Sequence, residues 1–155
     1  MGLLVVEIKE YSKCNYEDFG LLCRSIEKTC KVAYILTLGV VGQMRRQGIA
    51  TILLNKLTEN LTTNPVFEDC KAIYLHVLTT NVAAINFYEK SHFRRHKLLP
   101  LYYLINSAAC DGYCYVLYLN GGRPPPTMLY PFQNNFYSIQ INFTSDYFLN
   151  FFILF

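Results

Sequence analysis

The stretch VAYILTLGVVGQMRRQGIATILL, residues 32–54, decides the fold. Residues 32–40 form a mostly apolar run, which is typical of a buried strand. Residues 42–48 contain two glycines and two arginines and predict a loop. Apolar side chains then recur every four residues from Ile49 to Leu61, which predicts an amphipathic helix directly behind the loop.

The rest of the chain supplies strands and a second helix around this unit. Asn64-Pro65 ends the first helix, and Ile52 is expected on its apolar face. Residues 11–30 are predicted to form a polar loop. The other expected strands are residues 3–8, 72–78, 93–98 and 113–119, and a short helix follows the N-cap candidates Thr79, Thr80 and Asn81 and runs to about Ser91. The order strand–strand–helix–strand–helix–strand–strand predicts an α/β fold with a mixed central sheet.

Length and composition indicate one compact domain followed by a tail. The chain has 155 residues, of which 52% are hydrophobic and 16% charged, so it is neither disordered nor fibrous. Its net charge of +3 argues against a dedicated nucleic-acid binder. We predict a domain over residues 1–123 and an aromatic-rich tail over residues 124–155. The tail is either unstructured or a segment that contacts a membrane or a partner.

The cysteines fit a reducing, cytoplasmic compartment. There are six, without CxxC spacing or a neighbouring histidine that would complete a zinc ligand set, and reduced thiols are expected. No apolar run approaches the roughly 18 residues that span a bilayer. Cys110 and Cys114 flank Asp111-Gly112, a turn signal, and are therefore expected to face each other across a hairpin.

The loop before the first helix has the composition of a phosphate site. A helix N-terminus offers unpaired N–H groups and a partial positive charge, and small residues at Gly48 and Ala50 allow a phosphate to approach the backbone. The plain alternative is a tight turn with two solvated arginines, Arg45 and Arg46. The loop matches neither GxxxxGK[ST] nor GxGxxG.

Several segments together resemble a known family. The strand at residues 33–40, the Arg-x-x-Gly-x-Ala loop and the helix behind it resemble the acetyl-CoA motif of the GNAT acetyltransferase superfamily. Residues 81–93, with Ala83-Ala84-Ile85-Asn86-Phe87-Tyr88-Glu89-Lys90, resemble its second cofactor motif. Residues 34–41, 70–81 and 111–122, with Leu99-Pro100 and Tyr102-Tyr103, resemble the NatF-type N-terminal acetyltransferases, over approximately residues 2–125.

This resemblance implies a GNAT (acyl-CoA N-acyltransferase) fold, N-terminally truncated relative to the family, and a set of site residues. Tyr34 and His76 match the family's catalytic residues, which accept the amine proton directly or through water. The implied co-substrate is acetyl-CoA, the implied substrates are Met-starting N-terminal peptides, and no metal is required. The implied acetyl-CoA-binding residues are Leu38, Gly39, Val40, Arg46, Gln47, Gly48, Ile49, Ala50, Thr51, Asn81, Tyr88, Glu89, Lys90 and Ser91; Leu36, Tyr102 and Tyr103 match the peptide channel.

Other readings remain open at the level of sequence. His76 and Tyr34 are also compatible with ordinary strand residues of a core. The chain lacks family elements before its first strand, so a catalytically inactive fragment that binds acetyl-CoA or a partner is the main alternative. The family implies the cytosolic face of the Golgi membrane as the location, a homodimer is a further option, and no nucleic-acid partner is expected.

Overall fold

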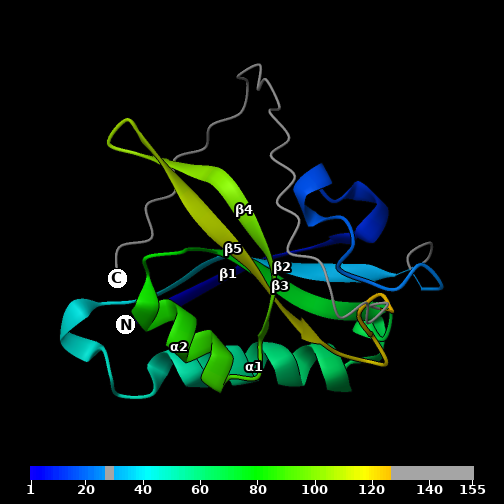
Figure 1. The fold of residues 1–155 in the computed structure, drawn as a ribbon. Helices are drawn as coiled ribbons and strands as arrows, with labels where there is room; N and C mark the ends of the chain where they lie inside the picture. Colours follow the sequence, from blue (N-terminus) through cyan, green and yellow to red (C-terminus); the bar gives the residue numbers. More distant parts are fainter. Residues whose placement is uncertain (27–29, 127–155) are drawn as a thin grey trace.

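The computed structural model describes residues 1–26 and 30–126, and these residues form a mixed sheet with two α-helices (Figure 1). The predicted order of elements is confirmed. The strands are β1 (Gly2–Glu10), β2 (Lys31–Val40), β3 (Cys70–Leu78), β4 (Arg94–Ile105) and β5 (Ala108–Tyr118); the helices are α1 (Ile49–Thr63), α2 (Val82–Lys90) and the 3-10 turns η1 (Tyr11–Lys13), η2 (Tyr16–Asp18), η3 (Gly42–Met44) and η4 (Pro65–Phe67).

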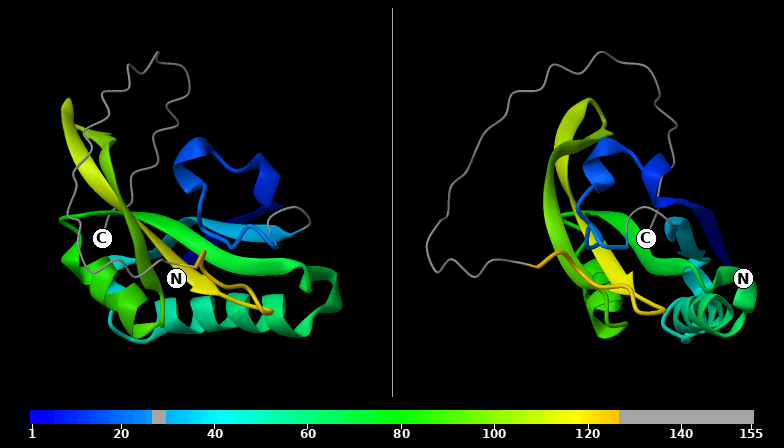
Figure 2. Two further views of the ribbon diagram at one scale, coloured as in Figure 1. Left: turned by 45° about the vertical axis from the view of Figure 1, so that its right-hand side comes forward. Right: turned by 90° about the vertical axis from the view of Figure 1, so that its right-hand side faces the viewer.

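The sheet order is β1-β2-β3-β5-β4. Among these five strands, β2 and β3 form a parallel pair, whereas β1–β2, β3–β5 and β4–β5 are antiparallel. Figures 1 and 2 show α1 and α2 on one face of the sheet and η1 and η2 on the other. This arrangement gives the sheet two separate buried faces.

Strands β2 and β3 pair over only part of their length. Their ladder runs from Lys31 opposite Cys70 to Tyr34 opposite Tyr74, and residues 35–40 have no partner on β3. On the other edge of β2, the register with β1 shifts so that Leu36 is left over as a bulged residue. A bulge bends its strand and increases the local twist. The second half of β2 therefore diverges from β3, and a split opens within the sheet.

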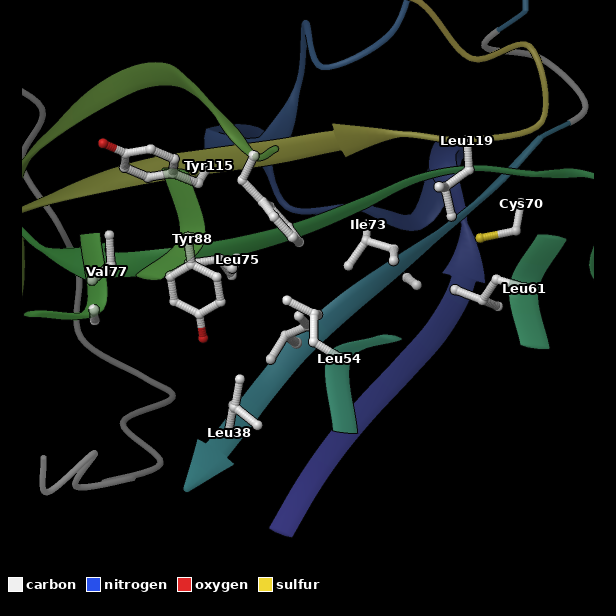
Figure 3. Close-up of a cluster of buried hydrophobic side chains, with 14 residues drawn as sticks. Leu38, Leu54, Leu61, Cys70, Ile73, Leu75, Val77, Tyr88, Tyr115 and Leu119 are labelled. Carbon is white, nitrogen blue, oxygen red and sulfur yellow. The ribbon is translucent and has the colours of Figure 1, made fainter. Parts of the chain in front are cut away.

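The core between the sheet and α1 shows which residues of this helix are buried, and one position differs from the prediction. Leu54 and Leu61, seven residues apart, are the buried positions of α1, whereas Ile52 is 58% exposed. The prediction that Ile52 lies on the apolar face is thus wrong. Leu53 and Leu57 pack against the same core as the two buried leucines, and Ile52 lies outside this face. Figure 3 shows Leu54 and Leu61 beneath strand residues such as Ile73 and Leu75.

The hairpin of β4 and β5 turns earlier than the sequence predicted. Asn106 and Ser107 both have positive φ (49° and 63°) and form the two-residue connection, as a twist-matched hairpin turn requires. Asp111 and Gly112 therefore lie inside β5, and Cys110 and Cys114 lie on one strand rather than facing each other. All six cysteines are free thiols.

Residues 11–26, predicted as a polar loop, pack apolar side chains into the protein. Tyr11, Leu21 and Leu22 are buried in a second core on the face of the sheet opposite the α-helices. In this core lie also the charged Asp18 and the side chain of Tyr74. The segment is therefore a structured cover over β3 and not a solvated loop.

The C-terminal part of the domain is held to the covering segment 11–26 at Arg123, whose carbonyl accepts a hydrogen bond from the Cys23 N–H at 3.1 Å. The predicted tail, apart from its first three residues, lies outside the described residues, so its role stays a prediction. In residues 1–26 and 30–126, no helix has both the length and the apolar character that crossing a bilayer requires.

Candidate active site

His76 lies at the centre of a buried polar cluster beside the split. It stands on β3, two residues beyond the last β2–β3 pair, and is 6% exposed. Its Nδ1 lies 2.7 Å from the hydroxyl of Tyr102 and 3.2 Å from that of Tyr34. The structure therefore brings together residues from β2, β3 and β4 that the sequence analysis had assigned to catalysis and to the peptide channel.

Asp18 completes this cluster, and sequence reasoning missed it. Its Oδ1 lies 2.8 Å from His76 Nε2, its Oδ2 accepts a hydrogen bond from the Tyr74 hydroxyl at 3.0 Å, and it is 1% exposed. The residue comes from η2, within the segment predicted to be a polar loop. No local sequence pattern marks Asp18 as buried, and its neighbour Phe19 is itself 45% exposed.

The partners of His76 assign its tautomer. An ionised carboxylate only accepts hydrogen bonds, so Nε2 carries the proton that is donated to Asp18. Nδ1 is then the unprotonated nitrogen and accepts from the two phenols. A neutral imidazole held in this way has its basic lone pair directed at Tyr34 and Tyr102 and is suited to accept a proton from that side.

The tyrosines of the cluster are held in the phenol form. Burial, followed by the charge of Asp18, raises the pKa of Tyr34 to about 12. Burial also raises the pKa of Tyr102 and of Tyr74 well above that of an exposed tyrosine. These hydroxyls therefore keep their protons and can donate hydrogen bonds near neutral pH.

The predicted phosphate loop has an open backbone. Arg46 and Gly48 both have positive φ (60° and 78°), and a side chain at Gly48 would meet no other atom within 4 Å. The first helical bond of α1 joins the Ile52 N–H to the Gly48 carbonyl, so the N–H groups of the three residues between them have no partner inside the helix. The arrangement leaves donors and a partial positive charge for an anion.

The predicted contacts of the cofactor arm lie along the split. Gly39 and Val40 lie in the half of β2 that has lost β3. Both pair with β1, and the Val40 carbonyl also accepts a hydrogen bond from Arg45 Nε at 3.0 Å. Leu38 is buried against α1, and Leu36, the bulged residue, is half exposed. The backbone polar groups of residues 35–39 that point away from β1 have no partner on β3 and can pair with a polar chain inserted in the split.

The second predicted motif lies on α2. Asn81 caps this helix through its Oδ1, which accepts from the Ala84 N–H, so its side-chain NH2 group is the part left for a ligand. Tyr88 is buried beside Leu54 (Figure 3), and burial raises its pKa. Glu89 accepts a hydrogen bond from Tyr115. Lys90 is exposed, and Ser91 ends the helix with its hydroxyl on the Phe87 carbonyl.

The pair Tyr102 and Tyr103 is placed by an irregularity in β4. The β4–β5 register shifts between Leu99 and Tyr103, and Leu101 has a positive φ of 53°. The Leu101 N–H donates to Asp111 Oδ1 at 2.8 Å. A Cβ on Gly112 would lie 3.0 Å from the Tyr103 ring and 3.4 Å from Tyr102. The Asp111-Gly112 pair thus holds the bulge and makes room for the two rings.

Known proteins resemble the chain in sequence and structure. Residues 16–93 match the acetyltransferase (GNAT) family model. N-alpha-acetyltransferase 60 of Danio rerio is 49% identical over 128 residues, which cover 83% of this chain and 52% of the relative. The Drosophila melanogaster protein of that name is 43% identical over 150 residues, covering 83% and 54%. The chain spans about half the length of these curated relatives.

Among solved structures, Arabidopsis thaliana NAA60 in complex with a bisubstrate analogue superposes with a TM-score of 0.66 and 32% identity, over 77% of this chain and 65% of that chain. The complex of the same Arabidopsis protein with acetyl-CoA gives a TM-score of 0.66 and 33% identity, over 77% and 66%. The fold described above is therefore shared with proteins solved with these ligands.

Proposed function

The chain belongs to the acetyltransferase (GNAT) family, and we propose that it transfers the acetyl group of acetyl-CoA to the α-amine of a protein N-terminus. The observation that carries the proposal is the His76 cluster beside the split. A buried imidazole donates its Nε2 proton to Asp18 and directs the lone pair of Nδ1 at two phenols. This is the arrangement expected of a general base.

The cluster offers a route for the amine proton. An N-terminal ammonium has a pKa of about 8, so a neutral imidazole can accept its proton near neutral pH. We propose that the Tyr34 oxygen accepts a proton from the amine or from a bridging water while the Tyr34 hydroxyl proton passes to His76 Nδ1. Asp18 stabilises the imidazolium that results, because its carboxylate already holds Nε2.

The residues around the split fit acetyl-CoA. It would supply a thioester-activated acetyl group. The N–H groups at the start of α1 and the open site at Gly48 would hold its pyrophosphate, and the free half of β2 would pair with the amides of its arm. We propose Tyr88, a buried phenol that burial keeps protonated by raising its pKa, as the donor of a proton to the leaving thiolate.

We also propose Met-starting N-termini as the substrates. Leu36 is half exposed at the bulge of β2, and Tyr102 packs edge-to-face on Tyr103 with ring centroids 5.0 Å apart. An apolar and aromatic lining suits a thioether side chain. The cytosolic face of the Golgi membrane remains the proposed location, with residues 127–155 as the proposed membrane contact. Pelleting with liposomes before and after removal of those residues tests that contact.

The function is tested with the purified chain, acetyl-CoA and a Met-Lys peptide. We expect N-terminal acetylation of the peptide and its loss in His76→Ala, with a thermal shift by acetyl-CoA retained in that variant. Gly48→Glu should instead remove the thermal shift, because it places a carboxylate at the proposed pyrophosphate site. Binding without transfer in the unmutated chain would favour the inactive, acetyl-CoA-binding fragment, and full activity in His76→Ala would refute the assigned base.

A further inference from the structure

Cys114 lies beside the His76 cluster and takes no part in the proposed acetyl transfer. Cys114 lies opposite His76 in the antiparallel β3–β5 ladder, so the two side chains share a face of the sheet. It is 0% exposed. One ligand atom each from Asp18, His76 and Cys114 lies within 4.8 Å of the other two.

These three donors form a recognisable ligand set. A thiolate, an imidazole nitrogen and a carboxylate oxygen suit Zn²⁺, which takes three protein ligands and a water in open tetrahedral sites. Zinc bonds of about 2.0–2.3 Å place ligand atoms roughly 3.3–3.7 Å apart. The observed spacing brackets that value, since the Asp18–His76 contact is shorter, at 2.8 Å, and none exceeds 4.8 Å. Side-chain adjustments of about 1 Å complete the geometry.

The charges also balance. The carboxylate of Asp18 and a thiolate at Cys114 carry two negative charges, which a divalent cation neutralises, so the occupied site would be a neutral buried unit. We propose that Asp18, His76 and Cys114 form a binding site for Zn²⁺ that switches off the proposed acetyl transfer. The inhibitory part rests on the proposed function, whereas the metal site itself does not.

The tautomer of His76 explains the inhibition. In the metal-free cluster Nε2 carries the proton and Nδ1 is the base. Zinc that binds Nε2 displaces that proton to Nδ1, where it is donated to a phenol oxygen, and the Cys114 thiol proton leaves to solvent. His76 then has no free lone pair for the amine proton. Its catalytic nitrogen is lost without any change in the backbone.

Cys14 provides a matched control. It is also a buried thiol of this core, but its Sγ lies 3.8 Å from the Tyr74 hydroxyl, on the Oδ2 side of Asp18, and it is not one of the three clustered donors. A cysteine that is buried near the site but outside the ligand set separates coordination from a general effect of removing a thiol.

The test is a Co²⁺ titration of the purified full chain under reducing conditions without chelators. We expect a saturable one-to-one spectrum with tetrahedral d–d bands and a thiolate-to-cobalt charge-transfer band, which Zn²⁺ removes. Cys114→Ser should lose the charge-transfer band and weaken binding by at least about tenfold. Cys14→Ser should keep both. Cys114→Ala is the second variant, because it leaves no unpaired hydroxyl if serine disturbs the fold.

Three spectroscopic outcomes overturn the site: no saturable spectrum, a band that survives loss of Cys114, or a band that disappears in Cys14→Ser. Activity supplies the second readout. Zn²⁺ should inhibit the unmutated chain reversibly, with recovery on addition of a chelator, and should inhibit Cys114→Ser at least about tenfold more weakly relative to that variant's own metal-free rate. If the chain is active but gives no cobalt spectrum, the proposed function stands and the metal site is overturned. If the chain gives the cobalt spectrum but is inactive, the metal site stands and the proposed function is overturned.

Discussion

Replacement of Asp18 by asparagine tests the tautomer argument directly. The amide oxygen can replace one of the two carboxylate oxygens, which accept from Tyr74 at 3.0 Å and from His76 at 2.8 Å. When the amide oxygen accepts from Tyr74, the amide NH2 group faces Nε2 of His76 and donates to it. The substitution Asp18→Asn therefore makes Nε2 an acceptor and moves the imidazole proton to Nδ1. The nitrogen that faces Tyr34 and Tyr102 is then no longer basic.

The expected losses are large in rate and moderate in stability. A positioned general base contributes about 10²–10⁴-fold, so kcat should fall by about 10²-fold or more. One charge-assisted hydrogen bond in a buried site contributes about 1.5–3 kcal/mol, and the free energy of unfolding should fall by that amount. Affinity for acetyl-CoA should not change, because Asp18 hydrogen-bonds no residue of α1 or of the free half of β2 among those described.

Two measurements decide the outcome. Steady-state kinetics give kcat, and two-dimensional NMR of the imidazole nitrogens gives the tautomer, which is assignable because the chain has only three histidines. Tyr74→Phe is the control: it removes the other side-chain hydrogen bond to the Asp18 carboxylate and leaves the His76 contact, so it should cost a similar amount, roughly 1.5–3 kcal/mol, and keep the tautomer. An unchanged kcat in a folded Asp18→Asn chain, or an unchanged tautomer, would refute the reasoning.

Three further predictions concern the scaffold and the tyrosines. Asn120→Ala should lower the free energy of unfolding by about 2–3 kcal/mol in urea denaturation, because the side-chain NH2 group donates to three carbonyls at 2.9–3.2 Å and φ is 48°; Asn120→Gly, which relieves the backbone, should lose less. Asp111→Ala should raise KM for the peptide more than it changes acetyl-CoA affinity, since the Leu101 bulge that seats Tyr102 loses its acceptor, and Asp111→Asn should restore much of the loss; equal effects on both ligands would contradict this. The free energy of unfolding should decline between pH 10 and pH 12, because the Tyr34 phenol ionises near pH 10 in the unfolded chain and near pH 12 in the folded one, so the unfolded state loses its proton first. Denaturation at a series of pH values should show a fall of about 2–3 kcal/mol from Tyr34 alone. A flat profile would count against the burial of Tyr34.

The parts of the fold that sequence could predict are those with a local cause. The apolar run of β2, the four-residue spacing of α1 and the Asn81 cap of α2 each leave a mark within a few residues, and the structure has each of them. The exposed Ile52 and buried Leu54 show the limit, because the helix pattern allowed both and only packing against the sheet selects one.

The resemblance singled out three residues of the His76 cluster, whereas the residue brought in by a long-range contact could not be predicted. His76, Tyr34 and Tyr102 stood in segments with a recognisable pattern, whereas Asp18 meets His76 across 58 positions of sequence from a segment without periodicity. The turn at Asn106 and Ser107 was missed for a related reason. Asp111-Gly112 is the stronger local turn signal. In the structure, however, the Asp111 carboxylate accepts a hydrogen bond from the bulge of β4, and the absence of a side chain at Gly112 leaves room for the tyrosine rings there.

The partial pairing of β2 and β3 has a consequence for how the protein responds to whatever fills the split. The amides of residues 35–40 that face away from β1 lack a strand partner, so they should exchange with deuterium quickly in the empty chain. A ligand that pairs with them would act as an extra length of strand. Its binding energy then also stabilises the sheet. As the site fills, protection from hydrogen exchange should extend from the split to the β1–β2 ladder.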